Sequence, residues 1–393
     1  MSAIDRLSAA LQDIDVDSFT SKEERLAAED ILVKALAKVR SPWDITWDHN
    51  WAHPATQVAV KTLIDAGVFK KWAEHGSKPT TSKELARLTN TDPALIARLV
   101  RHLAAVHLLI ETAEDTYKPT PWATTLGTDS ALPSCYGAFY YDINNAMGRE
   151  VPVFLKKTGY KNITDSKNGV IQHMLGPEAS FFGYAVSDPV RNRELSDAME
   201  CHSRWNLTAW PDLFPTDTLL ENAKPERPLV VDVGGSKGHD LEKFRLKHPE
   251  VAHGSLVLQD LPAVLQDIEP PHVSIVKHPY DFFTPQPLKG ARVYFMHNVL
   301  HDWSNEPAVK ILKNVADAME KGYSKLLIHE SMVDNVNPPS RVTTSDIIML
   351  TCVAAAERTV KEWYEVIESA GLKVVKIWKR PAAVEGVIEV EPS

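Results

Sequence analysis

A glycine-rich turn follows the first apolar strand of the C-terminal half, and its composition suits a nucleoside ligand. The apolar run 228–233 contains Asp232 and leads into three glycines, Gly234, Gly235 and Gly238. Glycine lets a ligand lie against the backbone, and the helix expected from about residue 239 points its free N–H groups into the same space. Asp260 closes the next predicted strand, where a carboxylate can accept hydrogen bonds from both hydroxyls of a ribose.

Two residues after the third predicted strand suit the adenine of such a nucleoside. The carboxylate of Asp281 can accept a hydrogen bond from the exocyclic amine, and the ring of Phe282 can cover the base. Both aspartates have ordinary alternatives. Asp260 can cap the turn at Pro262, and Asp281 can be a plain loop residue.

His301 is the best candidate for a general base. Imidazole titrates near neutral pH, so it can take a proton from a phenol at physiological pH. Glu330 and Glu357 are the carboxylates that could orient the ring and stabilise the imidazolium. The alternative is a hydrogen-bonded structural histidine, whereas His297 and His329 suit structural or cofactor-contact roles.

The elements that carry these residues alternate between strand and helix. Strands are expected at 228–233, 255–259, 273–277, 291–297 and 323–329, with helices that include 238–248 and 305–320. This alternation predicts an α/β fold with a Rossmann-like, doubly wound parallel sheet, which gathers the strand-end residues at one edge. After a helix near 360–370, two more strands at 371–378 and 384–390 predict a terminal antiparallel hairpin.

The N-terminal third is mostly helical in pattern, and part of it has the outline of a winged helix. Thr81 or a neighbour can cap one helix, Asp92 and Pro93 can start a second, and 108–111 with 116–119 suit a short hairpin. Residues 81–120 hold five basic and five acidic side chains, a balance that favours packing or dimerisation over DNA contact.

We therefore expect three regions. They are an N-terminal dimerisation domain at 1–125, a helical connecting and substrate-lid region at 126–210, and a catalytic domain at 211–393. The aromatic side chains of the middle region suit either a helical core or a wall over a flat substrate, and Met199 and Trp205 are candidate substrate contacts.

Taken together, these residues resemble the class I S-adenosylmethionine-dependent O-methyltransferases. The likeness is to the fungal and plant small-molecule group that includes the caffeate and flavonoid enzymes. It rests on the segments Asp232–Gly238, Gln259–Pro262, Asp281–Phe283, Val299–Ser304, Leu327–Glu330 and Glu357–Thr359, and covers roughly residues 45–390. The set is specific, whereas any one motif alone would be weak.

The resemblance implies a role for each matching position. S-adenosylmethionine would be the cofactor, His301 the general base, and Glu330 and Glu357 its partners. Cofactor contacts would come from Asp232, Gly234, Gly235, Gly238, Asp260, Leu261, Asp281, Phe282 and His297. Plant members often have a cofactor-contacting lysine where this chain has His297. Ser236 and Lys237 replace what is often a third glycine and a small residue.

The expected reaction is methyl transfer to a hydroxyl group of a small aromatic or polyketide-type metabolite, with a phenol as the favoured acceptor. One alternative is a methyltransferase-like pericyclase or cyclase that keeps the cofactor without transferring its methyl group. Two further hypotheses are weaker. A DNA-binding regulator conflicts with the charge balance, and a nicotinamide-dependent dehydrogenase conflicts with the terminal hairpin.

Composition limits the partners and the compartment. The net charge of −9 argues against general affinity for nucleic acid or anionic membranes. The three scattered cysteines, Cys135, Cys201 and Cys352, form no metal-site spacing or disulfide framework, which predicts a reducing compartment. The start of the chain lacks the pattern of a secretory signal, so we expect a cytoplasmic protein. Apolar faces on the N-terminal helices predict a homodimer.

Overall fold

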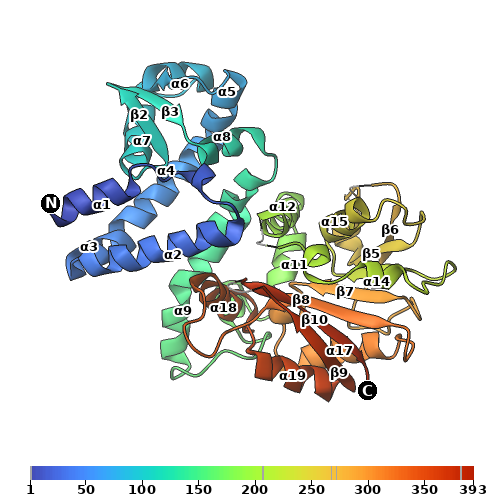
Figure 1. Cartoon of the computed structure of the whole chain (residues 1–393). Coiled ribbons are helices and arrows are strands. Elements are labelled where there is room, and N and C mark those ends of the chain that lie inside the picture. The colour runs from blue at the N-terminus through green and yellow to red at the C-terminus, as the bar shows by residue number, and fades with distance from the viewer. Residues whose placement is uncertain (1, 206–207, 267, 271, 381–382) are drawn as a thin grey trace. The chain divides into compact units, whose positions relative to one another are not determined.

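The computed structural model (Figure 1) describes residues 2–205, 208–266, 268–270, 272–380 and 383–393. The contacts divide the chain into two units: residues 1–54 with 381–383, and residues 55–380 with 384–393. The three-region division at 125/126 and 210/211 stays a prediction. In the described residues, no helix is both long and apolar enough to span a bilayer. The cytoplasmic location also stays a prediction.

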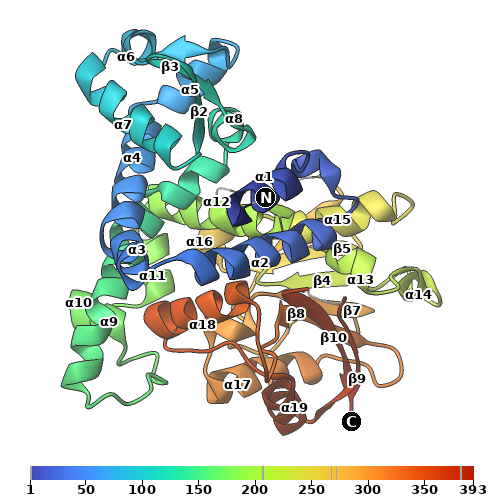
Figure 2. The ribbon, with the colours of Figure 1, turned by 60° about the vertical axis from the view of Figure 1, so that its left-hand side comes forward.

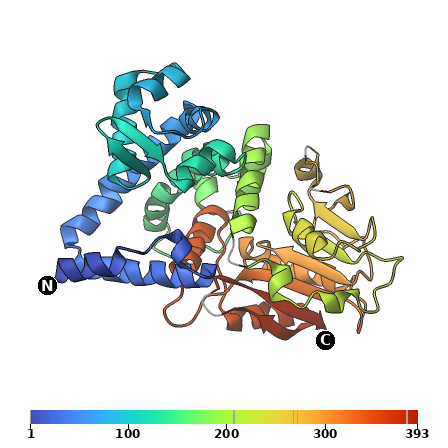
Figure 3. The ribbon, with the colours of Figure 1, turned by 45° about the horizontal axis from the view of Figure 1, so that its top comes forward.

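A seven-stranded sheet forms the centre of the C-terminal region, in the order β6-β5-β4-β7-β8-β10-β9. The strands are β4 (Val230–Val233), β5 (Leu256–Asp260), β6 (Ile275–Pro279), β7 (Val293–His297), β8 (Lys325–Ser331), β9 (Leu372–Trp378) and β10 (Glu385–Pro392). The first five pair in parallel, whereas β10 pairs antiparallel with β8 and β9. In Figure 3 the sheet runs from yellow strands at one edge to dark red strands at the other. The parallel sheet and its terminal hairpin are therefore confirmed.

Helices cover both faces of this sheet, as doubly wound folds require (Figure 2). On one face α17 (Asn305–Ala316) and α19 (Val360–Ser369) pack their apolar sides against strand residues such as Tyr294 and Met296. On the other face α13 (Trp210–Leu213) and α15 (His239–Lys247) pack against residues such as Phe295. The apolar strands are buried on both sides, so their carboxyl-end loops are the parts of the sheet left for ligands.

Residues 53–128 form a separate small core. Its helices are α4 (His53–Asp65), α5 (Val68–Glu74), α6 (Ser82–Thr89), α7 (Pro93–Ala105) and α8 (Pro121–Thr128), and β1 (Thr80–Thr81), β2 (Leu109–Ala113) and β3 (Thr116–Pro119) form a three-stranded sheet. Asp92 caps α7 by accepting the N–H of Leu95, and Pro93 occupies the first turn. The predicted order of helix, turn, helix and hairpin is present. The winged-helix assignment stays a prediction.

The connecting region is helical. It contains η3 (Leu132–Tyr136), η4 (Ala138–Asn144), α9 (Asn145–Lys157), α10 (Val170–Leu175), α11 (Phe181–Val186) and α12 (Pro189–Trp205). Its buried aromatic residues Phe139 and Phe154 share a core with α18 (Ser340–Val353). The remaining short elements after it are α14 (Asp217–Leu220), α16 (Pro262–Leu265) and η5 (Leu300–Asp302).

The N-terminal unit consists of α1 (Ala3–Leu11), η1 (Val16–Ser18), α2 (Lys22–Val39), α3 (Pro42–Trp47) and η2 (Asp48–Ala52). Ser21 and Ser41 cap α2 and α3 with their hydroxyl groups. Trp43, Trp47 and Trp51 recur every fourth residue and form a ladder of rings that is about half exposed.

Candidate active site

A cavity of about 430 Å³ opens at the carboxyl ends of β4, β5 and β7, the edge of the sheet that the sequence predicts for ligand binding. Most of the predicted cofactor contacts line it: Asp232, Gly234, Gly235, Asp260, Leu261, Asp281, Phe282 and His297. Gly238 lies outside its walls. That glycine is buried at the start of α15, where its positive φ of 77° suits a helix cap without a side chain.

The glycine turn leaves no room for side chains on its cavity side. A Cβ atom on Gly235 would lie 2.4 Å from the Asp232 carboxylate and 2.6 Å from Leu258. A Cβ on Gly234, which has a φ of 79°, would lie 2.9 Å from Val299. Ser236 adopts a φ of 50°, the left-handed backbone that a glycine takes more easily. The bare backbone can therefore approach a ligand closely.

Asp260 is fixed at the mouth of β5 by the backbone of the turn. Its Oδ2 accepts the N–H of Ser236 at 2.9 Å, and its Oδ1 accepts the N–H of Leu261 at 2.7 Å. Burial raises the pKa of Asp260 to about 6, although these two hydrogen bonds oppose the rise. Each carboxylate oxygen keeps a second acceptor position, so the group can still receive two hydroxyl donors.

Asp232 is a fully buried carboxyl group at the floor of the same cavity. Its Oδ2 has no hydrogen-bond partner among the described residues. Burial, and then the charge of Asp240, raise its pKa well above the usual range. A buried carboxyl group without a full set of partners is costly. A donor group on a bound ligand would satisfy it.

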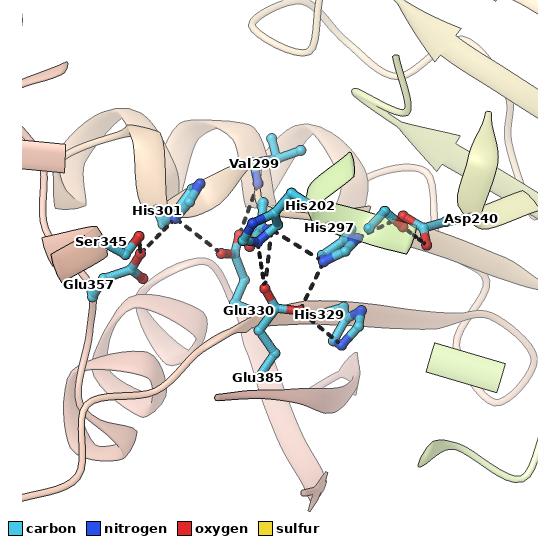
Figure 4. A network of polar contacts seen from close by, with 12 residues as sticks. His202, Asp240, His297, Val299, His301, His329, Glu330, Ser345, Glu357 and Glu385 are labelled. Atoms are coloured by element: carbon cyan, nitrogen blue, oxygen red, sulfur yellow. Dashed lines mark hydrogen bonds and ion pairs between the residues drawn. The ribbon is translucent and has the colours of Figure 1, made fainter. Parts of the chain in front are cut away.

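His301 lies in η5, just after β7, and one carboxylate fixes its orientation. Its Nδ1 lies 2.9 Å from Oε1 of Glu357, an atom that also accepts the hydroxyl of Ser345 at 2.5 Å. Because an ionised carboxylate can only accept, Nδ1 carries the proton in this pair. Figure 4 shows the other ring nitrogen, Nε2, pointing away from Glu357 and Glu330.

Glu330, at the end of β8, holds the loop that carries His301. Its Oε1 accepts the backbone N–H groups of Val299 and Leu300 at 3.0 and 2.8 Å. Its Oε2 lies 3.9 Å from Nδ1 of His301. Arg358 fixes the other side of the loop by donating to the carbonyl oxygens of Leu300 and Trp303. The histidine is therefore placed by both glutamates, one through its ring and the other mainly through its backbone.

The charges around His301 determine its protonation. Burial by itself lowers the pKa of the imidazole, but the carboxylates of Glu330, Asp302 and Glu357 outweigh burial and raise the pKa well above 6.5. Asp302 lies with Oδ1 3.6 Å from Nε2 of His301, and burial raises its own pKa to about 7. The site is thus built to stabilise an imidazolium.

A second network of histidines and carboxylates lies beside the first (Figure 4). His297 donates to Asp240 at 2.6 Å and to Glu385 at 3.1 Å, and its ring stacks on that of His329 with centroids 4.2 Å apart. Burial lowers the pKa of His297, but the two carboxylates outweigh it and raise the pKa to about 10. Burial and the neighbouring His297 cation lower the pKa of His329 to about 3. His202 joins the network through Glu385 at 3.0 Å.

A second cavity of about 490 Å³ adjoins the first. The two share Ser180, Phe182, Asp302 and Trp303 in their walls. The rest of the second cavity mixes apolar residues, such as Ile171, Phe181 and Val353, with polar ones, such as Lys167 and Glu178. His301 is not part of either wall, but its Nε2 lies 3.6 Å from Oδ1 of Asp302, a residue that lines both cavities.

The structure also contains site features that the sequence analysis missed. Asp240, Glu385 and Asp302 were not singled out, although Asp302 is adjacent to the predicted base. An acidic residue in the first helical turn after Gly238 and a glutamate at the start of the last strand are the available signals. Of the two candidate substrate contacts, Met199 lines the first cavity, whereas Trp205 is outside the walls of both and about half exposed.

Comparison with known proteins identifies the family of the chain. The family model described as an O-methyltransferase domain matches residues 161–373. O-methyltransferase mfmE of Annulohypoxylon moriforme is 40% identical over 388 residues, covering 98% of this chain and 95% of the relative. O-methyltransferase ATR12 of Stachybotrys chlorohalonatus is 33% identical, and the alignment covers 99% of this chain and 97% of the relative. The chain belongs to the class I S-adenosylmethionine-dependent O-methyltransferases.

Solved structures show the same fold over the whole chain. LepI C52A, in complex with SAH and a substrate analogue, aligns with a TM-score of 0.86 at 25% identity. The alignment covers 100% of this chain and 98% of the LepI chain. OxaC aligns with a TM-score of 0.81 at 23% identity, over 99% of this chain and 98% of its own.

Proposed function

We propose that this O-methyltransferase methylates a phenolic hydroxyl of a small aromatic or polyketide-type metabolite, with His301 as the general base. The observation that carries the proposal is the His301–Glu357 pair beside the junction of two cavities. One cavity has the carboxylates and glycines that a nucleoside needs, and the adjoining cavity offers apolar side chains such as Ile171 and Phe181 to a substrate. The experiment is incubation with isotopically labelled S-adenosylmethionine and a panel of phenols, read by mass spectrometry.

The residues of the first cavity fit the cofactor. Asp260 would accept the ribose hydroxyls, and Asp281 with Phe282 and Leu261 would hold the adenine end. The Gly234–Gly235 backbone and the unsatisfied oxygen of Asp232 would receive the methionyl end, near the His297 cation. The carboxylate of the methionyl part would then lie near the His297 cation, and its ammonium could donate to Asp232.

The bound cofactor supplies an activated methyl group on a sulfonium, so the protein needs only to position and deprotonate the acceptor. The apolar side chains of the second cavity, such as Phe181 and Val353, would orient an aromatic substrate, and orientation of this kind can contribute about 7–11 kcal/mol. His301 Nε2 would accept the hydroxyl proton, and Glu357 and Glu330 would stabilise the imidazolium that results.

The raised pKa of His301 predicts a distinctive pH dependence. Only neutral imidazole can accept a proton, so methyl transfer should rise with pH through a midpoint above 6.5. Glu357→Gln removes a carboxylate that raises this pKa, so the midpoint should move to lower pH. The maximal rate should also fall, by on the order of 10²-fold, because the amide no longer fixes the tautomer. The measurement is kcat against pH, with S-adenosylmethionine saturating.

Ser345→Ala is the matched control for this prediction. It removes one hydrogen bond to Glu357 but keeps the carboxylate beside His301. Its midpoint should stay close to the wild-type value. A midpoint in Glu357→Gln that matches wild type would show that Glu357 does not set the protonation of His301.

A pericyclase or cyclase is the second candidate function. It is favoured by one observation, the TM-score of 0.86 to a structure described as a pericyclic reaction enzyme. That likeness, at 24% identity, concerns the fold alone. The presence of His301 with its partner Glu357 favours methyl transfer. Product mass separates the two, because methylation adds a methyl group and consumes cofactor, whereas a cyclisation leaves the cofactor unchanged.

We also propose that the protein is a homodimer formed through the N-terminal unit. Trp43, Trp47 and Trp51 form one exposed apolar ridge, and Ile31 and Val39 on α2 are also exposed. Apolar patches of this kind are typical of protein interfaces. Light scattering after gel filtration should give twice the mass of 43.8 kDa for the wild type and a monomer for Trp47→Glu. A monomeric wild type, or a dimeric Trp47→Glu, would contradict this interface.

A further inference from the structure

Lys237 is a charged residue in a turn that otherwise consists of small residues, and it does not serve the cavity. Its neighbours Ser236 and His239 line the cofactor cavity, but Lys237 is not part of that wall. Its side chain leads to α12 instead. There its Nζ forms ion pairs with Asp197 and, at 2.9 Å, with Glu200.

The ion-pair cluster of Lys237, Asp197 and Glu200 is only partly exposed to solvent. The three side chains are 24%, 10% and 25% exposed. Burial lowers the pKa of Lys237, but hydrogen bonds to the two carboxylates outweigh it and raise the pKa, so the ammonium stays charged. Asp197 is itself fixed, because its Oδ2 accepts the hydroxyl of Ser134 in η3 at 2.6 Å.

This cluster joins two walls of one cavity. On α12, Ser196 and Met199 line the cavity, and each directly precedes one of the two acidic residues. In the glycine turn, Gly235 and Ser236 line the same cavity, and they directly precede Lys237 in the sequence. The ion pairs therefore connect the glycine turn and α12, the two elements that line this side of the cavity.

We propose that Lys237 is a positioning residue that holds α12 against the glycine turn and so slows the release of cofactor and product. This inference rests on the proposed cofactor site. Helix α12 has other ties to the catalytic region, through Lys243 to Ser203 and through His202 to Glu385. Loss of the cluster should therefore loosen the wall without detaching the helix.

The test is the dissociation rate of S-adenosylhomocysteine, measured by surface plasmon resonance on the full-length protein. Lys237→Met should dissociate about fivefold faster, as expected for loss of two partly screened ion pairs. Wild-type dissociation should accelerate with added NaCl, and the variant should respond less. Glu200→Gln should also speed release, and the double variant should not exceed Lys237→Met, since both changes act on one cluster.

Lys247→Met is the control, because Lys247 is on α15 but contacts the carbonyl of Pro211 rather than α12. Its dissociation rate should match wild type. If S-adenosylhomocysteine dissociates from Lys237→Met at the wild-type rate and with the wild-type salt dependence, the proposed role of Lys237 is wrong. If circular dichroism shows that this variant is misfolded, Glu200→Gln decides in the same way. Wild-type protein that fails to bind S-adenosylhomocysteine would instead refute the proposed cofactor site.

Discussion

Replacing His301 with alanine is expected to slow methyl transfer by roughly 10²–10⁴-fold, the usual contribution of a positioned general base. S-adenosylmethionine should still bind with nearly wild-type affinity, because His301 is not part of the cofactor cavity wall. The physical reason is that Glu357 holds Nδ1 of His301 and so leaves Nε2 to accept the hydroxyl proton. His297, by contrast, is held as a cation between two carboxylates.

The measurement combines kcat for a phenolic substrate with the Kd of S-adenosylmethionine from calorimetry. His253→Ala is the control, because His253 is exposed and lines neither cavity. A variant that retains wild-type turnover would remove His301 from the role of base. A variant that loses cofactor binding as well would point to a structural role for the loop.

Replacing Asp260 with alanine is expected to weaken S-adenosylmethionine binding by about 100-fold. Two hydrogen bonds from ribose hydroxyls to a carboxylate would be lost, each contributing about 1.5 kcal/mol or more. Turnover at saturating cofactor should change much less, since in the proposed site Asp260 would contact the nucleoside and His301 the methyl acceptor. Binding to the wild type should also weaken below pH 6, because the pKa of Asp260 is about 6 and its protonated form accepts less well.

Calorimetry at pH 7.5 and pH 5 tests this prediction. Asp260 also accepts the N–H groups of Ser236 and Leu261, so thermal unfolding without ligand must be compared. Asp260→Asn is the second variant, because it keeps one acceptor oxygen and should bind with intermediate affinity. Wild-type affinity in Asp260→Ala would show that the ribose lies elsewhere.

Local patterns were sufficient to predict most elements of the fold. Apolar strands alternating with helical periods predicted the parallel sheet, and each predicted strand starts within two residues of the observed one. Capping residues predicted helix starts, as Asp92 does for α7. These features depend on neighbours in sequence, which is why they can be read without the tertiary structure. The family resemblance added the roles that no spacing by itself could give.

The sequence by itself determined that Asp232, the glycine turn, Asp260, Asp281 and His301 all lie at or just after strand ends, so they had to share one edge of the sheet. The sequence did not determine the protonation states of these side chains. Only the tertiary structure brings Glu357, 56 residues further on, to within 2.9 Å of His301, and Asp240 and Glu385 to His297. Charge states depend on burial and on charges that lie close in space, and strand order brings such residues together from segments distant in sequence.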